Sequence, residues 1–569
     1  MSAVPAQRPT ERNTVTNAHT AATAPGGAGT SDTVTPDYDA LVIGAGFAGV
    51  RMLIELDKLG LSARALEAGT GIGGTWYWNR YPGARTDSVS WAYCFSFSDE
   101  VTQEWDWPER YPSHETVRAY LDFLIDKFSL RDKIQLNTRI VRAERDDENN
   151  LWTITTATGE TLTCTYFITA LGTLTEPVLP DIEGLDDFGG QILQSSRWPK
   201  EPVDLSDKRV AIIGTGSTGV QMIPELARQA KHLTVFQRTP NYILPSQNHE
   251  LDDTRRREIK ANYPEIWSQT RNHSFGFPMN PANRTYDDVT DEERTAIFEE
   301  GWAKGAFYFA FETFDDILVD ERSNEAAAEF IRGKIRDIVK DPVTAELLSP
   351  KGYPLLAKRP VIGNGYFETY NRDNVLLVDV KSDPIVSLTE TGLRTENAEY
   401  EFDRLVLATG FDAATGAFTE IDIQGSHGSL ADAWKDGPST VLGVSTPGFP
   451  NMLMITGPQA AFANMPVVIE EVVEFIGRIL ATMQSEGHAQ VMATPAGAQK
   501  WTEHTAEVVE LSLLREGGSV GSWFVGANVK DKPNKPMYYL GGAKAFFEEF
   551  HRQVETKFES FDFAGSTQN

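Results

Sequence analysis

The chain has 569 residues, more than one hydrophobic core usually serves, so we expect two or three packed units. Hydrophobic residues make up 41% and charged residues 23%, the balance of a soluble globular protein, and no apolar run approaches the ~20 residues that span a bilayer. With 52 basic and 81 acidic side chains the formal net charge is -29, which disfavours nucleic acid and anionic membrane surfaces as partners.

The N-terminal segment and the cysteines indicate where the protein resides. Residues 1–36 are rich in Ala, Thr, Pro and Gly and contain no apolar core of a secretory signal, so they are predicted to form a disordered tail. Cys94 and Cys164 are far apart in sequence and make neither a CxxC pair nor a metal-ligand cluster. We therefore expect a cytoplasmic protein without a metal site. The composition does not indicate the oligomeric state.

The first informative segment is "DYDALVIGAGFAGVRMLIELDKLGLSARALEAG". An apolar run ends at Ile43, a glycine-rich loop follows, apolar residues recur at helical spacing, and a second strand ends at Glu67. This pattern predicts a βαβ unit whose helix N-terminus binds a pyrophosphate, while Glu67 accepts a hydrogen bond from a ribose hydroxyl. The loop residues predicted to contact the nucleotide are Gly44, Gly46, Phe47, Ala48 and Gly49.

A second segment, "KRVAIIGTGSTGVQMIPELARQAKHLTVFQRTPNY", repeats this pattern with a different ending. Its second strand closes on Gln237, Arg238 and Thr239 instead of an acid. A cation beside a hydroxyl suits a 2'-phosphate, which a carboxylate would repel, so this unit is predicted to bind NADPH. The residues predicted to contact the nucleotide are Gly214, Thr215, Gly216, Ser217, Thr218, Gly219, Gln221, Arg238 and Thr239.

Two dinucleotide units in one chain predict an α/β flavoprotein with two Rossmann-like domains, in which NADPH passes hydride to FAD. Disulfide reductases share this layout but need a redox-active cysteine pair, which this sequence lacks. The electrons are therefore expected to pass to oxygen.

The stretch "GGTWYWNRYPGARTDS" follows the first unit. From Gly73 to Asp87 it matches a motif of the type I Baeyer-Villiger monooxygenases in full. A second stretch, "FGGQILQSSRWP", resembles that family's other fingerprint, with Gln194 in place of the family's His. Gln keeps a hydrogen-bond donor and an acceptor but cannot become charged. The resemblance assigns residues in and just after the first motif to the flavin. They are Gly74, Thr75, Trp76, Asp87 and Tyr93.

Further matches extend the resemblance from about Tyr38 to the C-terminus. "AKRPV" places Lys358 and Arg359 where the family has an NADPH-contacting Lys and a catalytic Arg, and "GSWFVGANVKDKP" places Trp523 in a mobile loop over the nicotinamide. The resemblance also implies that Asp87 orients Arg359 and that Gln194 supports communication between the domains. The histidines belong to no recognised motif and are interpreted as surface or core groups.

The order of the motifs predicts a split FAD domain around an inserted NADP domain. The predicted segments are residues 37–180 and 404–569 for the FAD domain, the latter with the mobile C-terminal loop, and 181–403 for the NADP domain. Within the NADP domain, residues about 250–348 are rich in acidic and helix-forming residues and are predicted to be a helical insertion.

The resemblance implies an NADPH- and O2-dependent reaction in which a flavin peroxide attacks a ketone carbonyl and an ester or lactone is formed. A cyclic or larger ketone is the expected substrate. Two alternatives remain open at this stage. One is an N- or S-oxidising flavin monooxygenase, and the other is an FAD protein in which Gln194 leaves NADPH oxidation uncoupled, so that peroxide is released.

Overall fold

The computed structural model describes residues 34–566. Nearly all of the predicted N-terminal tail lies outside this range. Within it, no helix combines the length and the apolar character that a membrane crossing requires. The same residues contain no group of three or more His, Cys, Asp or Glu side chains arranged to hold a metal ion.

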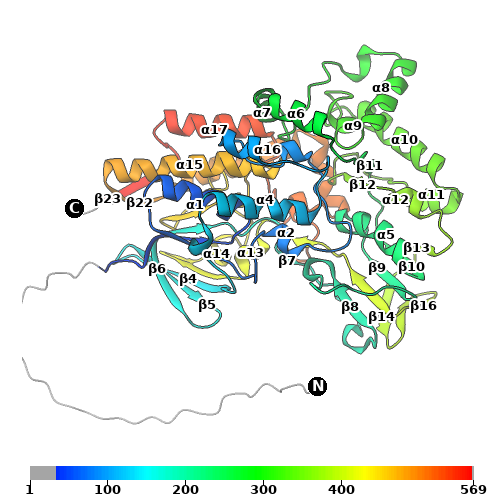
Figure 1. Ribbon diagram of the computed structural model, residues 1–569, viewed down its shortest axis with the longest axis horizontal. Helices are drawn as coiled ribbons and strands as arrows, with labels where there is room; N and C mark the ends of the chain where they lie inside the picture. Colours follow the sequence, from blue (N-terminus) through cyan, green and yellow to red (C-terminus); the bar gives the residue numbers. More distant parts are fainter. Residues whose placement is uncertain (1–33, 567–569) are drawn as a thin grey trace, which may run out of the picture. The chain divides into compact units, whose positions relative to one another are not determined.

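The first βαβ unit builds the centre of a large mixed sheet, in the order β20-β19-β4-β5-β6-β1-β2-β3 with β21 beside β6. Figure 1 shows β4, β5 and β6 of this sheet side by side. β1 pairs in parallel with β2 and β6, whereas β4, β5 and β6 form an antiparallel meander. The strands are β1 (Tyr38–Ile43), β2 (Ala63–Leu66), β3 (Ile134–Gln135), β4 (Ile140–Asp146), β5 (Leu151–Thr156), β6 (Thr161–Thr169), β19 (Asp422–Gly425), β20 (Gly428–Ser429) and β21 (Met452–Met454).

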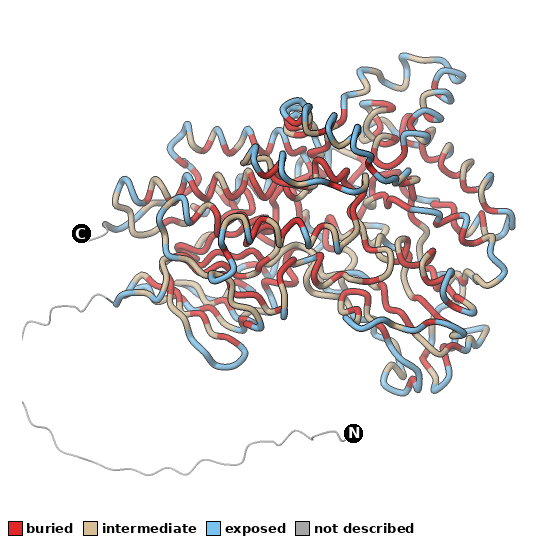
Figure 2. Tube along the Cα trace, in the orientation of Figure 1, coloured by how far each residue is buried: buried red, intermediate tan, exposed pale blue. Residues whose placement is uncertain are grey.

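Helices from both ends of the sequence pack beside this sheet. Gly477 lets the long C-terminal helix α15 approach α1, since a Cβ at this position would lie 2.9 Å from the Glu55 carboxylate. The helices of this part are α1 (Phe47–Lys58), α2 (Thr75–Trp78), α3 (Asp99–Glu104), α4 (His114–Lys127), α13 (Gly416–Thr419), α14 (Leu430–Ala433), α15 (Met465–Glu486), α16 (Pro495–Glu510) and α17 (Ala543–Glu555). Figure 2 shows that the strands and the inward helix faces are buried.

The second βαβ unit builds a parallel sheet in the order β13-β10-β9-β17-β8. Its strands are β8 (Gln191–Gln194), β9 (Arg209–Ile213), β10 (His232–Gln237), β13 (Val375–Asp379) and β17 (Arg404–Leu407), and helix α5 (Ser217–Gln229) connects β9 to β10. The two sheets confirm the predicted α/β fold with two dinucleotide-type units.

The strand pairing corrects one predicted boundary. The order of the sequence motifs predicts the return to the first unit at residue 404. β17 instead pairs in parallel with β9 and β8 of the second sheet. The return therefore comes after Leu407, where β18 (Phe411–Asp412) pairs with β7 (Glu176–Pro177). The other domain limits stay predictions.

A run of helices separates β11 (Ile243–Pro245) from its partner β12 (Val361–Gly363). Four of them begin at a Thr or Asp whose side chain accepts from the first turn, at Asp252, Thr290, Asp320 and Asp341. The helices are α6 (Asp253–Ala261), α7 (Tyr263–Asn272), α8 (Asp291–Lys304), α9 (Tyr308–Phe311), α10 (Glu321–Ile338) and α11 (Pro342–Leu348). The remaining elements are α12 (Tyr366–Thr369), β14 (Ile385–Thr389), β15 (Gly392–Thr395), β16 (Glu399–Glu401), β22 (His488–Ala493) and β23 (Phe561–Ser566).

Candidate active site

The first glycine loop leads into α1 without a side-chain cap. Gly46 is the N-cap residue, so the first N–H groups of the helix are free to bind an anion. Gly44 has a φ of +112°, and a Cβ there would lie 2.5 Å from the Ala170 carbonyl oxygen. Gly46 and Gly74 face each other, because a Cβ on Gly46 would lie 3.2 Å from the Cα of Gly74. The loop therefore fits a closely held pyrophosphate and is covered by the Gly74 segment.

Glu67 directly follows β2 and is buried beside this loop. Its carboxylate accepts from the backbone N–H of Ala45 at 2.9 Å and from that of Gly69 at 2.7 Å. These bonds fix the carboxylate at the position predicted for a ribose contact. Each oxygen keeps a lone pair, so a nucleotide hydroxyl is a possible further donor.

Aromatic side chains from the two predicted flavin segments converge at the first loop. Trp76 donates through Nε1 to the hydroxyl of Tyr93 at 3.2 Å. The Tyr93 ring in turn meets Phe47 edge to face at 5.4 Å between ring centroids. Ala48 and Gly49 are buried in the first turn of α1, and Thr75 is exposed at the start of α2. The structure thus brings the predicted flavin residues of this unit together.

The second glycine loop has the same backbone form but open surroundings. Gly214 has a φ of +113°, and Gly216 is the N-cap of α5, again without a side-chain cap. A Cβ on Gly216 would meet no atom within 4 Å. The Thr215 hydroxyl donates to the Thr239 carbonyl oxygen at 3.4 Å, which ties the loop to the end of β10. The open surroundings of this loop therefore suit a dinucleotide that binds and dissociates.

Two cations lie near the end of β10 without acidic partners among residues 34–566. They are Arg238, which is exposed, and Lys358, which is half-buried. Burial, together with the charge of Arg238, lowers the pKa of Lys358 to about 8. A pair of unneutralised cations is a site for an anion, and the predicted 2'-phosphate fits it. The loop that contains Trp523 also reaches this place, since a Cβ on Gly521 would lie 3.9 Å from the Arg238 guanidinium.

Arg359 and Asp87 form an ion pair between the two units. The two side chains are 20% and 24% exposed. Arg359 also donates to the Ser217 hydroxyl at 3.2 Å, at the start of α5. Burial lowers the pKa of the Arg359 guanidinium to about 10. The Asp87 carboxylate opposes this effect, because an opposite charge in contact favours the charged form, so Arg359 is a fixed positive charge at neutral pH.

Both ends of the Gln221 side-chain amide are bonded to the protein. Its side-chain oxygen accepts from the Tyr81 hydroxyl at 2.9 Å, and its amide nitrogen donates to the Arg85 carbonyl oxygen at 3.1 Å. Both partners belong to the "RYPGAR" segment that precedes Asp87. Gln221 therefore joins α5 to the segment that presents Asp87, and its contact with the cofactor stays a prediction.

Among the described residues, no hydrogen bond, ion pair or ring contact joins Gln194 or Trp523 to the ion pair. Gln194 ends β8, pairs with Leu407 and is half-buried. The indole of Trp523 packs against Phe462 at 5.1 Å and Tyr538 at 5.3 Å between centroids. Thr218, like Ser217, lies in the first turn of α5. The catalytic roles of Gln194 and Trp523 stay predictions.

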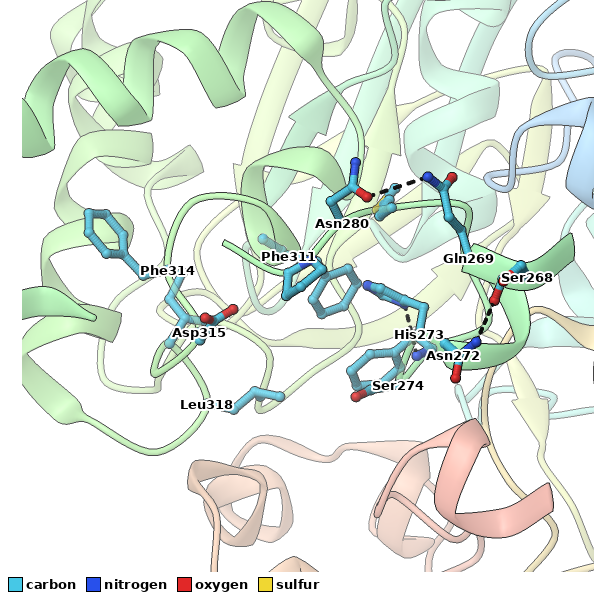
Figure 3. Close-up of a pocket in the computed structure, with 15 residues that line it drawn as sticks. Ser268, Gln269, Asn272, His273, Ser274, Asn280, Phe311, Phe314, Asp315 and Leu318 are labelled. Carbon is cyan, nitrogen blue, oxygen red and sulfur yellow. Dashed lines mark hydrogen bonds between the residues drawn. The ribbon is translucent and has the colours of Figure 1, made fainter. Parts of the chain in front are cut away.

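A cavity of about 370 Å³ lies between the C-terminal part of α7, the following loop and α9 (Figure 3). Its wall includes Phe275 and Phe311, which stack at 4.6 Å between centroids. Phe307 joins this wall to the ion pair, because its ring lies 5.9 Å from that of Phe311 and 5.8 Å from the Arg359 guanidinium carbon. The aromatic wall thus leads from the fixed charge to the cavity.

The sequence does not predict the cavity or the place of His273 in its wall. His273 belongs to no motif, and the sequence alone indicates a surface or core group. The dense aromatic pattern of "SFGF" and "FYFAF" was an available signal, but it is equally typical of a helical core.

Comparisons with known proteins agree with the resemblance. A sequence profile of the pyridine nucleotide-disulphide oxidoreductases matches residues 41–274. A Baeyer-Villiger monooxygenase of Pseudooceanicola batsensis is 43% identical over 90% of this chain and 93% of its own length. A phenazine N-monooxygenase of Lysobacter antibioticus is 42% identical over 92% and 96%. The structure of OTEMO in complex with FAD and NADP is 36% identical, covers 93% of this chain and 100% of its own, and superimposes with a TM-score of 0.89. The chain belongs to the Baeyer-Villiger monooxygenase family.

Proposed function

We propose that the protein is an FAD-containing monooxygenase that uses NADPH and O2 to convert a ketone into an ester or lactone. The observation that carries this proposal is the Asp87–Arg359 ion pair, formed where the two nucleotide units meet and at the end of an aromatic wall. Family membership supports the reaction type.

Arg359 supplies the charge that this reaction needs. Negative charge develops on oxygen when a carbonyl carbon is attacked, and a preorganised cation stabilises it without reorganising water. Asp87 holds the guanidinium in place, and the Ser217 hydroxyl fixes its second edge. The Phe307 ring beside it excludes water, which strengthens the interaction of the guanidinium with developing charge.

The two glycine loops fit the two cofactors. The covered loop at Gly46, with Glu67 at the strand end, suits the pyrophosphate and ribose of FAD, which when bound accepts hydride and activates O2. The open loop at Gly216 suits NADPH, with Arg238 and Lys358 on its 2'-phosphate.

The cavity beyond Phe307 is the proposed place for the body of the ketone. An aromatic wall and a volume of about 370 Å³ suit a cyclic substrate of moderate size. The carbonyl group would then lie at the Arg359 end, and the rest of the molecule would extend along the rings of Phe311 and Phe275.

The test follows NADPH consumption, peroxide release and product mass together. The FAD-loaded protein is incubated with cyclic ketones, alkyl aryl sulfides and phenazine. Lactone formed in proportion to NADPH consumed supports the proposal. Stoichiometric peroxide with every compound would contradict it and would favour the uncoupled alternative, which Gln194→His then tests directly.

N-oxidation is the second candidate function, because the relative from Lysobacter antibioticus is named as a phenazine N-monooxygenase. The same panel separates the two reactions. Exclusive formation of an N-oxide, with all ketones left unchanged, would establish this candidate.

We also propose a cytoplasmic location. Cys94 and Cys164 are both buried and unpaired in a described range that contains no disulfide, which suits a reducing compartment. Fractionation of cells that express the tagged protein tests this, and recovery outside the cytoplasm would contradict it.

A further inference from the structure

His273 presents an unused hydrogen-bond donor to the cavity. Its Nδ1 accepts from the backbone N–H of Phe275 at 3.1 Å. A neutral imidazole that accepts through Nδ1 carries its hydrogen on Nε2. Among the described residues, Nε2 has no hydrogen-bond partner, and in Figure 3 the ring extends from the backbone toward Phe311 and the other aromatic rings.

The surroundings keep this imidazole neutral. Burial lowers the pKa of His273 to about 4, and its ring lies against Phe311 at 5.4 Å and Phe277 at 5.9 Å between centroids. The ring therefore offers one hydrogen-bond donor to the cavity at neutral pH. Such a donor pairs with a neutral or anionic oxygen of a ligand.

Two contacts hold the His273 loop in place. On one side, Arg271 pairs with Glu470 at 2.7 Å and Glu471 at 2.8 Å, both on α15. On the other side, the carbonyl oxygen of Phe275 accepts from the backbone N–H of Asn464 at 2.9 Å. Both anchors come from the N-terminal part of α15 and the residue before it. The imidazole is thus positioned before any ligand arrives, which lowers the entropy lost on binding.

Three other polar side chains of the cavity already have protein partners. Gln269 donates to Asn280 at 3.4 Å, Asn272 donates to the Ser268 carbonyl oxygen at 2.9 Å, and Asp315 accepts from the Ala282 backbone at 2.9 Å. The first two of these bonds are drawn in Figure 3.

We propose that His273 is a specificity-determining residue, whose Nε2–H donates to an oxygen of the ketone substrate at the end remote from the reacting carbonyl. The inference rests on the proposed function and narrows its substrate class. The preferred substrates are ketones with an apolar ring body and a second oxygen function, which is a carbonyl, hydroxyl or ether. This second oxygen is separated from the reacting carbonyl by about the length of the aromatic wall.

The test compares two ketones that differ by one distal hydroxyl, 4-phenylcyclohexanone and 4-(4-hydroxyphenyl)cyclohexanone. The wild-type protein is expected to prefer the hydroxylated ketone in kcat/KM by about three- to tenfold, the effect of one hydrogen bond. The matched variants are His273→Asn, which keeps an acceptor for the Phe275 N–H but lacks the remote donor, and His273→Gln, which keeps a remote N–H. The preference should disappear in H273N and return in H273Q.

A control and a second readout separate this inference from the proposed function. His427→Asn, at an exposed histidine beside β20, should keep the wild-type preference. Calorimetric binding of both ketones to the FAD-loaded protein should show the same ratio without turnover. Absence of any oxygenated product, with the binding ratio intact, overturns the proposed function alone. An equal ratio in wild type and H273N, in both readouts, overturns the role of His273.

Discussion

The two glycine loops have the same pattern but different neighbours. Gly46 faces Gly74 across a gap that leaves little room for a side chain, whereas Gly216 has no atom within 4 Å of the place where its Cβ would lie. A covered loop suits a cofactor that stays bound, and an open loop suits one that is exchanged in every cycle. The two loops thus differ in the segments packed on them and not in their own backbone form.

The charged residues that follow β2 and β10 differ in the same way as the two loops, one being fixed by the protein and the other open. Glu67 is buried and already bonded to two backbone N–H groups, so its position is fixed before a nucleotide binds. Arg238 is exposed and lies beside Lys358 with no acid near either among the described residues. The first site is thus complete in itself, and the second is completed by the phosphate of its ligand.

The largest expected effect comes from the residue pair that joins the two regions. Arg359→Met removes the fixed positive charge and leaves Asp87 without its partner. Lactone formation should fall by about 10²–10³-fold, the cost of losing one preorganised donor to a developing oxyanion. Product formation is measured by gas chromatography, with the flavin absorbance as the control for FAD content. Retention of more than a tenth of the wild-type rate would contradict the assigned role.

Arg238→Ala tests the open region. The ratio of kcat/KM for NADPH to that for NADH should fall by about 10- to 100-fold, because a charge-assisted bond to the 2'-phosphate is worth about 1.5–3 kcal/mol. FAD content should not change. Lys231→Ala, which removes an exposed cation next to the start of β10, is the matched control. A loss of NADH activity equal to that of NADPH would show that Arg238 acts on the fold and not on the phosphate.

A pair of glycine substitutions compares the loops directly. Gly46→Ala places a methyl group 3.2 Å from the Cα of Gly74, so FAD affinity should fall by about tenfold. Gly216→Ala meets no protein atom, so FAD content should stay at the wild-type level while the KM for NADPH rises by about tenfold, because the methyl group enters the space of the pyrophosphate. Fluorescence of the released flavin and steady-state kinetics measure the two quantities. Equal loss of FAD in both variants would show that the different surroundings of the two loops do not determine which loop binds FAD.

Local sequence signals predict both glycine loops. The side-chain contacts between distant parts of the chain could not be predicted in this way. The strand, glycine turn and helix of each βαβ unit are adjacent in the chain, and the motifs that contain Asp87 and Arg359 are each one contiguous stretch. Gln221 was assigned to the cofactor because it lies in the loop region, yet its amide bonds to a segment 136 residues away. The His273 loop is likewise held by α15, about 200 residues later. No local pattern encodes such contacts.

The last and smallest expected effect is a pH dependence confined to the open region. The pKa of Lys358 in the free protein is about 8, and a bound 2'-phosphate raises it, since opposite charge favours the ammonium form. The contribution of Lys358 to NADPH affinity is therefore complete below pH 8 and is lost as the pH rises above it. The KM for NADPH should increase by about fivefold between pH 8 and pH 9, whereas the KM for NADH should not follow. Lys358→Arg, which stays charged throughout this range, should remove the dependence. A pH profile that is the same for both nucleotides, or unchanged in K358R, would place the titrating group elsewhere.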